Sequence, residues 1–162
     1  MPQPSQYDYF LAYLTTVEIA DMPAKEKAVV LLPLAAIEQH GPHLPVYTDS
    51  LIAEEVLKRA LVQLPINFPL WRLPILHYGK STEHTSFPGT VTLSAEGLMR
   101  ALHEIAASIA RAGFKRFVIL NAHGGNTEVV DFLLRDIRQE TGLMTFALHP
   151  FLRVAVPAQG LS

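Results

Sequence analysis

The chain has 162 residues, no cysteine, and 13 Lys and Arg against 15 Asp and Glu, which gives a formal net charge of -2. This length suits one domain, on a prior of about 100–200 residues per domain, so residues 1–162 are expected to form a single domain. A hydrophobic share of 49% excludes general disorder, and the balanced charge argues against a nucleic-acid partner. Without cysteine, disulfides, thiolate nucleophiles and cysteine-ligated metals are excluded. A metal site would have to use His and carboxylate side chains.

The sequence shows no targeting or membrane-spanning segment. Residues 1–10 are polar and contain proline, rather than a basic start followed by an apolar stretch. The longest apolar run, 28–37, is far shorter than the roughly 20 residues of a transmembrane helix. We therefore expect a cytoplasmic protein that has no membrane partner.

Strand and helix patterns alternate from the first apolar run onwards. Residues 28–37 are continuously apolar and rich in branched side chains, which is typical of a strand buried on both faces of a parallel sheet. The apolar spacing then predicts a helix over 49–64, capped by Thr48 or Asp49. A second strand is predicted over 70–78, where an internal proline favours an edge or a bulge.

The same alternation continues in the second half of the chain. A polar loop over 79–89 and a short strand over 90–93 lead to a helix that is capped by Ser94 and ended by Gly113. The remaining predicted elements are a strand over 117–120, a helix over 127–141 that is capped by Thr127 and closed by Gly142, and a strand over 144–148. Such alternation predicts an α/β fold with a mainly parallel sheet covered on both faces.

Polar side chains gather where these strands end, which is where open α/β sheets bind their ligands. The cluster after the first strand contains Glu38 and His40, which share a face of extended backbone because they are two residues apart. Asp49 and His43 are further candidates. Glu, His and Asp together supply the oxygen and nitrogen ligands that suit a divalent transition metal. The alternative is that Asp49 caps a helix and the loop histidines bond to backbone.

A second cluster, Asn-Ala-His-Gly-Gly-Asn at 121–126, follows another predicted strand. His123 would point from the strand end into the same crevice. Glycine permits close approach of a ligand, and free amides at a helix start can hold an oxyanion. Gly124, Gly125 and Asn126 are therefore candidate substrate contacts, although a plain strand-to-helix turn also uses glycine.

The third cluster is the polar loop over 78–90, which contains Glu83 and His84. These two adjacent residues are candidates for an acid/base or orienting pair. The loop itself is either a substrate lid or a surface loop whose histidine bonds locally.

Together the three clusters resemble the creatininase (creatinine amidohydrolase) family. Glu-Gln-His-Gly-Pro-His-Leu-Pro-x-x-Thr-Asp at 38–49 is similar to the hallmark motif of that family. The stretch Glu-His-x-x-Phe-Pro-Gly-Thr-x-Thr-Leu at 83–93 resembles the second family motif, and 121–126 resembles the third. The order and spacing of the motifs match over about residues 27–150.

The resemblance implies a three-layer α/β/α sandwich and a metal-dependent amidohydrolase. Such an enzyme cleaves a C–N amide bond, in a cyclic amide, a formamide or a related small molecule, by metal-activated water. The positions that match Glu38, His40, Asp49 and His123 bind a pair of divalent metals in the family, usually zinc, manganese or iron, and Asp49 would bridge the pair. His84 and Glu83 are the local candidates for protonating the leaving group. Family members tend to be homo-oligomers, often hexamers.

The sequence departs from the family pattern in two places. Creatininase itself has a metal-binding Glu where Gly125 stands here. Family chains also usually continue into a late His-Ala-Gly-Glu-like motif, and nothing like it follows Asn126. The alternative to an active enzyme is therefore a truncated or degenerate member, short of the C-terminal part of the fold, that binds metal or assembles with partners without turnover.

Overall fold

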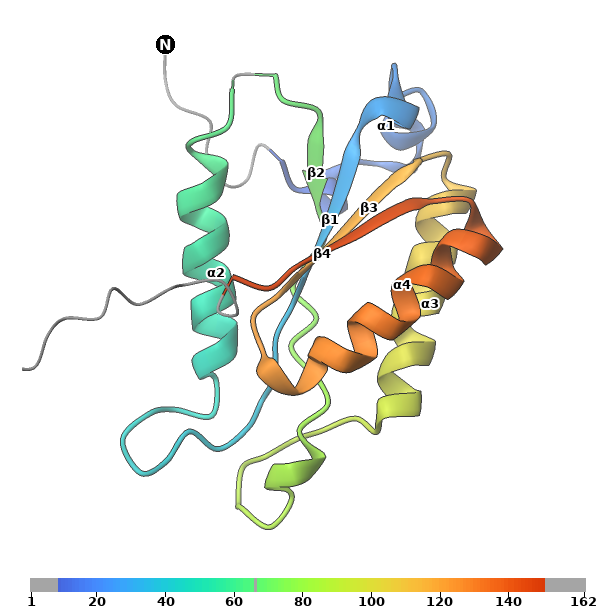
Figure 1. Cartoon of the computed structure of the whole chain (residues 1–162). Coiled ribbons are helices and arrows are strands. Elements are labelled where there is room, and N and C mark those ends of the chain that lie inside the picture. The colour runs from blue at the N-terminus through green and yellow to red at the C-terminus, as the bar shows by residue number, and fades with distance from the viewer. Residues whose placement is uncertain (1–8, 66, 151–162) are drawn as a thin grey trace, which may run out of the picture.

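The computed structural model describes residues 9–65 and 67–150, which fold around one parallel sheet (Figure 1). The strand order is β2-β1-β3-β4, and every neighbouring pair runs parallel. The strands are β1 (Val29–Leu34), β2 (Leu70–Arg72), β3 (Arg116–Asn121) and β4 (Met144–Leu148). β1 and β3 are therefore the two central strands, and the segments that follow them start from the middle of the sheet.

Helices lie on both faces of the sheet. α2 (Thr48–Leu61) packs on one face, and α3 (Ala95–Arg111) and α4 (Thr127–Thr141) lie together on the other (Figure 1). The short elements are the helix α1 (Thr16–Ala20) and the 3-10 turns η1 (Leu11–Tyr13), η2 (Lys25–Lys27), η3 (Thr82–His84) and η4 (Gly124–Asn126). The predicted three-layer α/β/α fold with a parallel sheet is confirmed.

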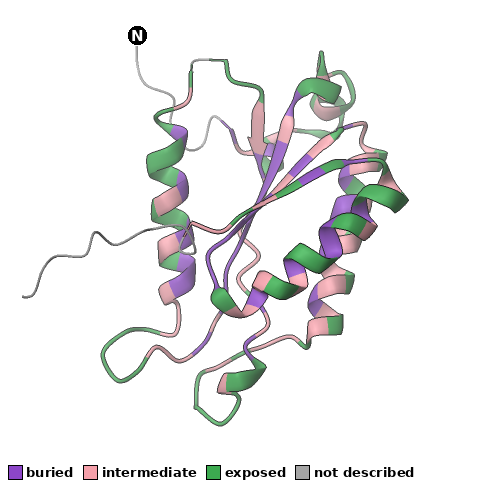
Figure 2. Cartoon of the chain, viewed as in Figure 1, coloured by how far each residue is buried: buried purple, intermediate pink, exposed green. Residues whose placement is uncertain are grey.

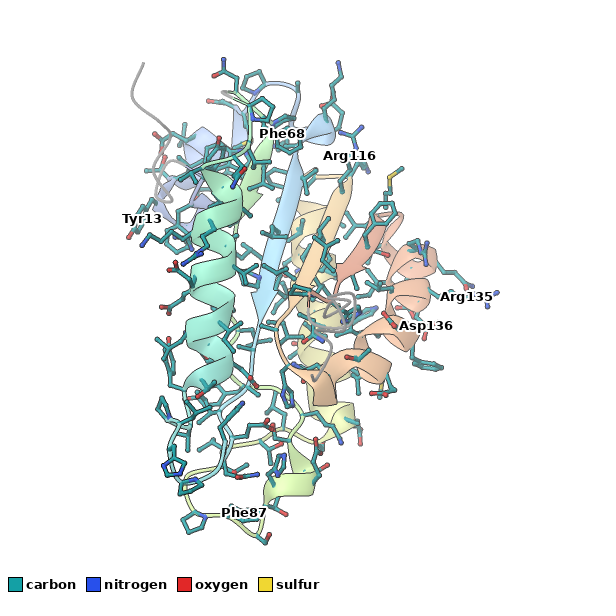
Figure 3. All side chains as sticks on the ribbon, turned by 60° about the vertical axis from the view of Figure 1, so that its left-hand side comes forward. Tyr13, Phe68, Phe87, Arg116, Arg135 and Asp136 are labelled. Carbon is teal, nitrogen blue, oxygen red and sulfur yellow. The ribbon has the colours of Figure 1, made fainter. Side chains whose placement is uncertain are left out.

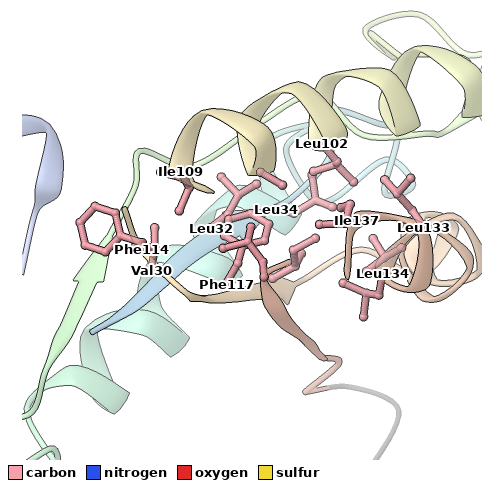
Figure 4. Packing of buried hydrophobic residues seen from close by; sticks show 14 of the residues in the cluster. Val30, Leu32, Leu34, Leu102, Ile109, Phe114, Phe117, Leu133, Leu134 and Ile137 are labelled. Carbon is pink, nitrogen blue, oxygen red and sulfur yellow. The ribbon is translucent and has the colours of Figure 1, made fainter. Parts of the chain in front are cut away.

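Alternate residues of β1 pack into different hydrophobic clusters, which explains why the sequence of this strand is apolar throughout. Val30 and Leu32 lie in the cluster under α3 and α4 (Figure 4). Leu31 instead belongs to a second cluster, together with Leu57 of α2. Side chains of a strand point to its two faces in turn, so a strand covered on both faces has no polar position. Figure 2 shows the resulting burial along β1 and β3.

Phe117 of β3 anchors the larger of these clusters, and its side chain is fully buried. The change Phe117→Ala is expected to lower the free energy of unfolding by about 3–5 kcal/mol, because it removes apolar contacts and leaves a cavity. The matched control is Phe132→Ala on α4, where the side chain is 68% exposed and the expected change is within about 0.5 kcal/mol. Urea unfolding followed by circular dichroism measures both. Equal losses in the two variants would contradict this core.

β2 is much shorter than the strand predicted over 70–78. Pairing with β1 covers only Leu70–Arg72, and it resumes as a single bridge between Leu34 and Leu76. Pro74 lies between these two points and has no N–H to donate to a neighbouring strand. The proline therefore interrupts the strand rather than bending it.

Two other extended segments are also shorter than predicted. The first apolar run, predicted as a strand over 28–37, leaves the sheet after Leu34. The strand predicted over 90–93 is reduced to one antiparallel bridge between Val91 and Ile37. This bridge ties the loop before α3 to the segment after β1.

The helix caps agree with prediction at α3 and differ at two other helices. Ser94 caps α3, and its side chain accepts a hydrogen bond from the amide of Gly97 at 3.0 Å. Tyr47, not Thr48 or Asp49, precedes α2, and Asn126, not Thr127, precedes α4. Asp49 lies inside the first turn of α2, so the capping interpretation of its carboxylate is wrong.

β4 lies at an edge of the sheet, and the described residues cover it on one face only. Thr145 is buried and donates to the carbonyl of Leu134 in α4, whereas Phe146 and Leu148 on the opposite face are each more than half exposed. No helix among the described residues is long and apolar enough to cross a membrane. The single-domain prediction extends to residues 1–8 and 151–162, which lie outside the described residues.

Candidate metal centre

The loops that follow β1, β2 and β3 gather at one end of the sheet, at the bottom of Figure 1. Parallel strands present their carboxyl ends at the same edge, so these loops necessarily meet. The segment after β1 carries Glu38 and His40 and leads into α2, whose first turn contains Asp49. The loop after β3 contributes His123.

These four predicted ligands form one connected group. Nε2 of His40 lies 3.1 Å from Oδ1 of Asp49 and 3.9 Å from Oε1 of Glu38. Nδ1 of His123 lies 2.9 Å from Oδ2 of Asp49 and 3.3 Å from Oε1 of Glu38. Each carboxylate therefore faces both histidines, and Asp49 presents a different oxygen to each ring.

A backbone carbonyl holds the other nitrogen of each histidine. Nδ1 of His40 lies 3.1 Å from the carbonyl oxygen of Glu38, and Nε2 of His123 lies 3.0 Å from that of Lys80. A carbonyl only accepts, so in the neutral rings these nitrogens carry the hydrogen. The nitrogens that face the carboxylates then keep their lone pairs. Metal-binding histidines are usually held in this way by a hydrogen bond from their second nitrogen.

The two carboxylates are buried together without enough partners for their charge. Glu38 and Asp49 are 6% and 5% exposed. Oε2 of Glu38 and Oδ2 of Asp49 make no hydrogen bond to any residue that the structure describes. Buried ionised groups are normally paired or coordinate a metal. The donor set of two carboxylates and two oriented imidazoles therefore fits a divalent metal ion.

The charge of these carboxylates also acts on His123. Burial is the largest influence on its ring and opposes protonation, but a protonated ring would donate from Nδ1 to Asp49 and face the charge of Glu38, and these two effects outweigh burial. The pKa of His123 is consequently raised above its ordinary value. The site attracts positive charge at the point where the four side chains converge.

Two overlapping groups of side chains could each hold one ion. Glu38, His40 and Asp49 offer one ligand atom each, and these atoms lie within 4.8 Å of one another. Glu38, Glu83 and His123 form a second group of the same kind. Glu38 belongs to both, so the two groups are adjacent.

The loop between β2 and α3 is fixed against this centre along its first half. The amide of Lys80 donates to Oδ1 of Asn126 at 2.8 Å, and the carbonyl of Lys80 accepts from His123. Phe87 lies at the far tip of the loop, where it is half-exposed (Figure 3). The part of the loop that carries Glu83 and His84 is therefore held in place by the loop after β3.

Gln39, a residue that the sequence did not single out, orients His84. The amide of Gly41 donates to Oε1 of Gln39 at 2.9 Å, which turns the side-chain nitrogen of Gln39 towards Nδ1 of His84 at 3.0 Å. Nδ1 must accept this bond, so the neutral ring carries its proton on Nε2. Nε2 lies 3.9 Å from Oε2 of Glu38. In the sequence, the only signal for Gln39 is its position between the predicted ligands Glu38 and His40. In extended backbone its side chain points to the opposite side from theirs.

Glu83 lies next to the centre but is engaged with a lysine. Oε2 of Glu83 lies 2.7 Å from Nζ of Lys80. The hydrogen bond from Lys80 is the main cause that lowers the pKa of Glu83. This carboxyl is thus held in its charged form.

The other predicted site residues, His43, Gly124 and Asn126, differ in how far they are buried and in what they contact. His43 is exposed and belongs to neither ligand group. Gly124 is exposed, with open space around it. Asn126 is fully buried, and its side chain bonds to the backbone of Lys80 and Ala35 and to Asn121. Asn126 therefore links the segments that carry Ala35, Lys80 and Asn121. Of the three predicted substrate contacts in this loop, Gly124 and Gly125 remain as candidates.

Known proteins resemble this chain over two thirds of its length or more. The family model for creatininase, described as creatinine amidohydrolase, matches residues 12–160. A mycofactocin precursor peptide peptidase from Mycobacterium ulcerans is 40% identical over 116 residues, which are 68% of this chain and 46% of that protein. The creatinine amidohydrolase of Pseudomonas putida is 32% identical over 138 residues, which are 80% of this chain and 52% of that protein. The chain thus spans about half the length of these curated relatives.

Solved creatininase structures share the fold. A mutant creatininase described as Zn-Zn type has a TM-score of 0.74 and 29% identity, and the match covers 93% of this chain and 61% of that one. A manganese form of creatininase gives a TM-score of 0.73 at 31% identity, with the same shares covered. The family model covers far more than half of the chain. The chain belongs to the creatininase family.

Proposed function

We propose that this chain carries the metal centre of an amidohydrolase that cleaves a C–N amide bond. The observation that carries the proposal is the convergence of Glu38 and Asp49, each with an unbonded buried oxygen, on two imidazoles whose second nitrogens are fixed by carbonyls. This arrangement is costly without a cation and is suited to one.

Zinc or manganese are the ions we propose, with iron as a further possibility from the same ligand types. The related creatininase structures are described as Zn-Zn and Mn forms. A divalent ion bound here supplies a Lewis acid that lowers the pKa of water and polarises a carbonyl oxygen. We propose two ions per site, because two adjacent groups of side chains, which share Glu38, could each hold one ion.

His84 is the proton donor that we propose for the leaving nitrogen. The bond from Gln39 leaves the proton of the neutral ring on Nε2, on the side that faces Glu38. Glu83 is the other candidate from the sequence, but Lys80 holds it in the charged form, in which it has no proton to donate. A positioned side chain of this kind contributes about 10²–10⁴-fold to a rate.

The substrate class we propose is a small molecule with a C–N amide bond, whether cyclic, formyl or peptide-like. The two named relatives are a precursor peptide peptidase and a creatinine amidohydrolase, and both names describe cleavage of such a bond. Gly124 and Gly125 have backbone amides beside His123, and we propose that these amides contact the substrate carbonyl oxygen.

The test is release of amine from a lactam, a formamide and a short peptide by protein that is first stripped of metal and then loaded with Zn²⁺ or Mn²⁺. We expect turnover of at least one substrate only in the loaded protein. Turnover that persists after exhaustive chelation would contradict a metal-dependent reaction. Bound metal without any turnover would favour the alternative, a family member that binds metal or assembles with partners but does not catalyse.

A further inference from the structure

A side chain does not fit at position 125, because Glu83, a residue distant in the sequence, lies beside Gly125. A Cβ atom added at Gly125 would lie 2.6 Å from Oε1 of Glu83, 2.5 Å from Nε2 of His123 and 2.6 Å from the carbonyl oxygen of Lys80. Contacts this short are not tolerated between such atoms. The carboxylate of Glu83 thus occupies the space beside the His123 ring that a side chain at 125 would fill.

The loop around Glu83 holds it in that space. Lys80 is bonded through its amide to Asn126 and through its carbonyl to His123, and its Nζ binds Oε2 of Glu83 at 2.7 Å. Gly79, the residue before it, packs closely against the segment after β1, since a Cβ there would lie 2.5 Å from the carbonyl oxygen of Ala35. One oxygen of Glu83 is therefore taken by the lysine, and the other, Oε1, is directed to the loop after β3.

The neighbours of Glu83 form a donor set with it. Glu83, Glu38 and His123 offer ligand atoms that lie within 4.8 Å of one another, next to the separate group of Glu38, His40 and Asp49. Glu38 has an oxygen with no hydrogen bond among the described residues. A carboxylate, a second carboxylate and an imidazole are sufficient to hold a divalent ion together with solvent.

We propose that Glu83 is a metal ligand and that, with His123 and Glu38, it holds the second of two divalent ions. The first ion is held by Glu38, His40 and Asp49. This inference rests on the proposed function, because it assigns one of the two positions in the same centre. It also separates the roles of two adjacent residues: Glu83 binds metal, and His84 carries the proton.

The experiment is a calorimetric titration of metal-stripped protein with ZnCl₂, in which the stoichiometry is measured without any substrate. We expect two equivalents for the unmodified chain and one for Glu83→Gln, whose second equivalent should bind at least about 10–100-fold more weakly. His40→Ala should also bind one equivalent, and the double variant none. Glu83 is exposed, so its replacement should leave the far-ultraviolet circular dichroism spectrum unchanged.

The matched control is Glu128→Gln, which makes the same change of charge at an exposed position in the first turn of α4. It should retain two equivalents. Two equivalents in Glu83→Gln, or a single equivalent in the unmodified chain, would overturn the assignment of Glu83 while leaving a metal centre in place. No zinc binding by the unmodified chain would instead overturn the proposed function itself.

Discussion

Replacing Glu38 by Gln is expected to abolish the metal-induced stabilisation of the protein. Glu38 is the one side chain shared by both candidate ligand groups, so this single change weakens both positions. A metal at one hundred times its dissociation constant adds about 2.7 kcal/mol to the free energy of unfolding. For a chain of this size that corresponds to a rise in melting temperature of roughly 5–10 °C. The same rise should be absent in Glu38→Gln.

The same substitution, Glu38→Gln, is expected not to lower the melting temperature of metal-free protein. In metal-free protein, Glu38 and Asp49 are two buried carboxylates that lie near the same histidines, and one oxygen of each has no hydrogen bond within the described residues. Two like charges in one buried site disfavour each other, so removing one of them relieves this repulsion. Metal-free Glu38→Gln should therefore melt no lower than the metal-free unmodified chain. Differential scanning calorimetry with and without ZnCl₂ measures both effects of Glu38→Gln.

Glu128→Gln is the control for this experiment too, and it should show the full metal-induced rise. Turnover by Glu38→Gln should fall to the level of the chelated protein, because its ions are lost. A full rise in melting temperature for Glu38→Gln would show that metal binds without Glu38, and the proposed ligand set would then be wrong.

Replacing His84 by Ala is expected to lower kcat by about 10²–10⁴-fold while the metal content stays unchanged. The reason is that His84 carries a proton towards the centre but belongs to neither ligand group. The loss should be larger for an alkyl amide than for a nitroanilide, since a nitroaniline leaving group needs less help from an acid. Steady-state kinetics on matched substrates, together with elemental analysis, checks both statements.

The matched control for His84 is His103→Ala. His103 lies on α3, pairs with Glu140 of α4 at 2.6 Å and belongs to neither ligand group. It should leave kcat unaltered for both leaving groups. Equal losses in His84→Ala for the two leaving groups would mean that His84 positions the site rather than donating a proton.

The sequence was sufficient to predict the four main ligand candidates, because their signal is local. Glu38 and His40 are two residues apart after a buried strand, and His123 follows another such strand. The carboxyl ends of parallel strands meet at one edge, so the order of elements alone brings these residues together. Asp49 was ambiguous, because a carboxylate at a helix start is also a common cap. Its place inside the first turn of α2 and the direction of its side chain, towards His40 and His123, distinguish the two roles.

The supporting contacts could not be predicted, because they use groups without a sequence signature. The carbonyl of Lys80, which orients His123, would be the same atom in any residue. Gln39 orients His84 through a contact between residues 45 positions apart. Gly125 is predicted as a substrate contact or as part of a plain strand-to-helix turn, yet its lack of a side chain is required by the approach of Glu83. Such long-range packing depends on how two loops meet, which no local pattern records.

The most direct test of the metal centre is a crystal structure of the zinc-loaded protein, with data collected on both sides of the zinc absorption edge. We predict an anomalous peak about 2.0–2.2 Å from Nε2 of His40 and an oxygen of Asp49, and a second peak at the same distance from Nδ1 of His123. Zinc bound only at other histidines of the chain, with no peak among Glu38, His40, Asp49 and His123, would contradict it.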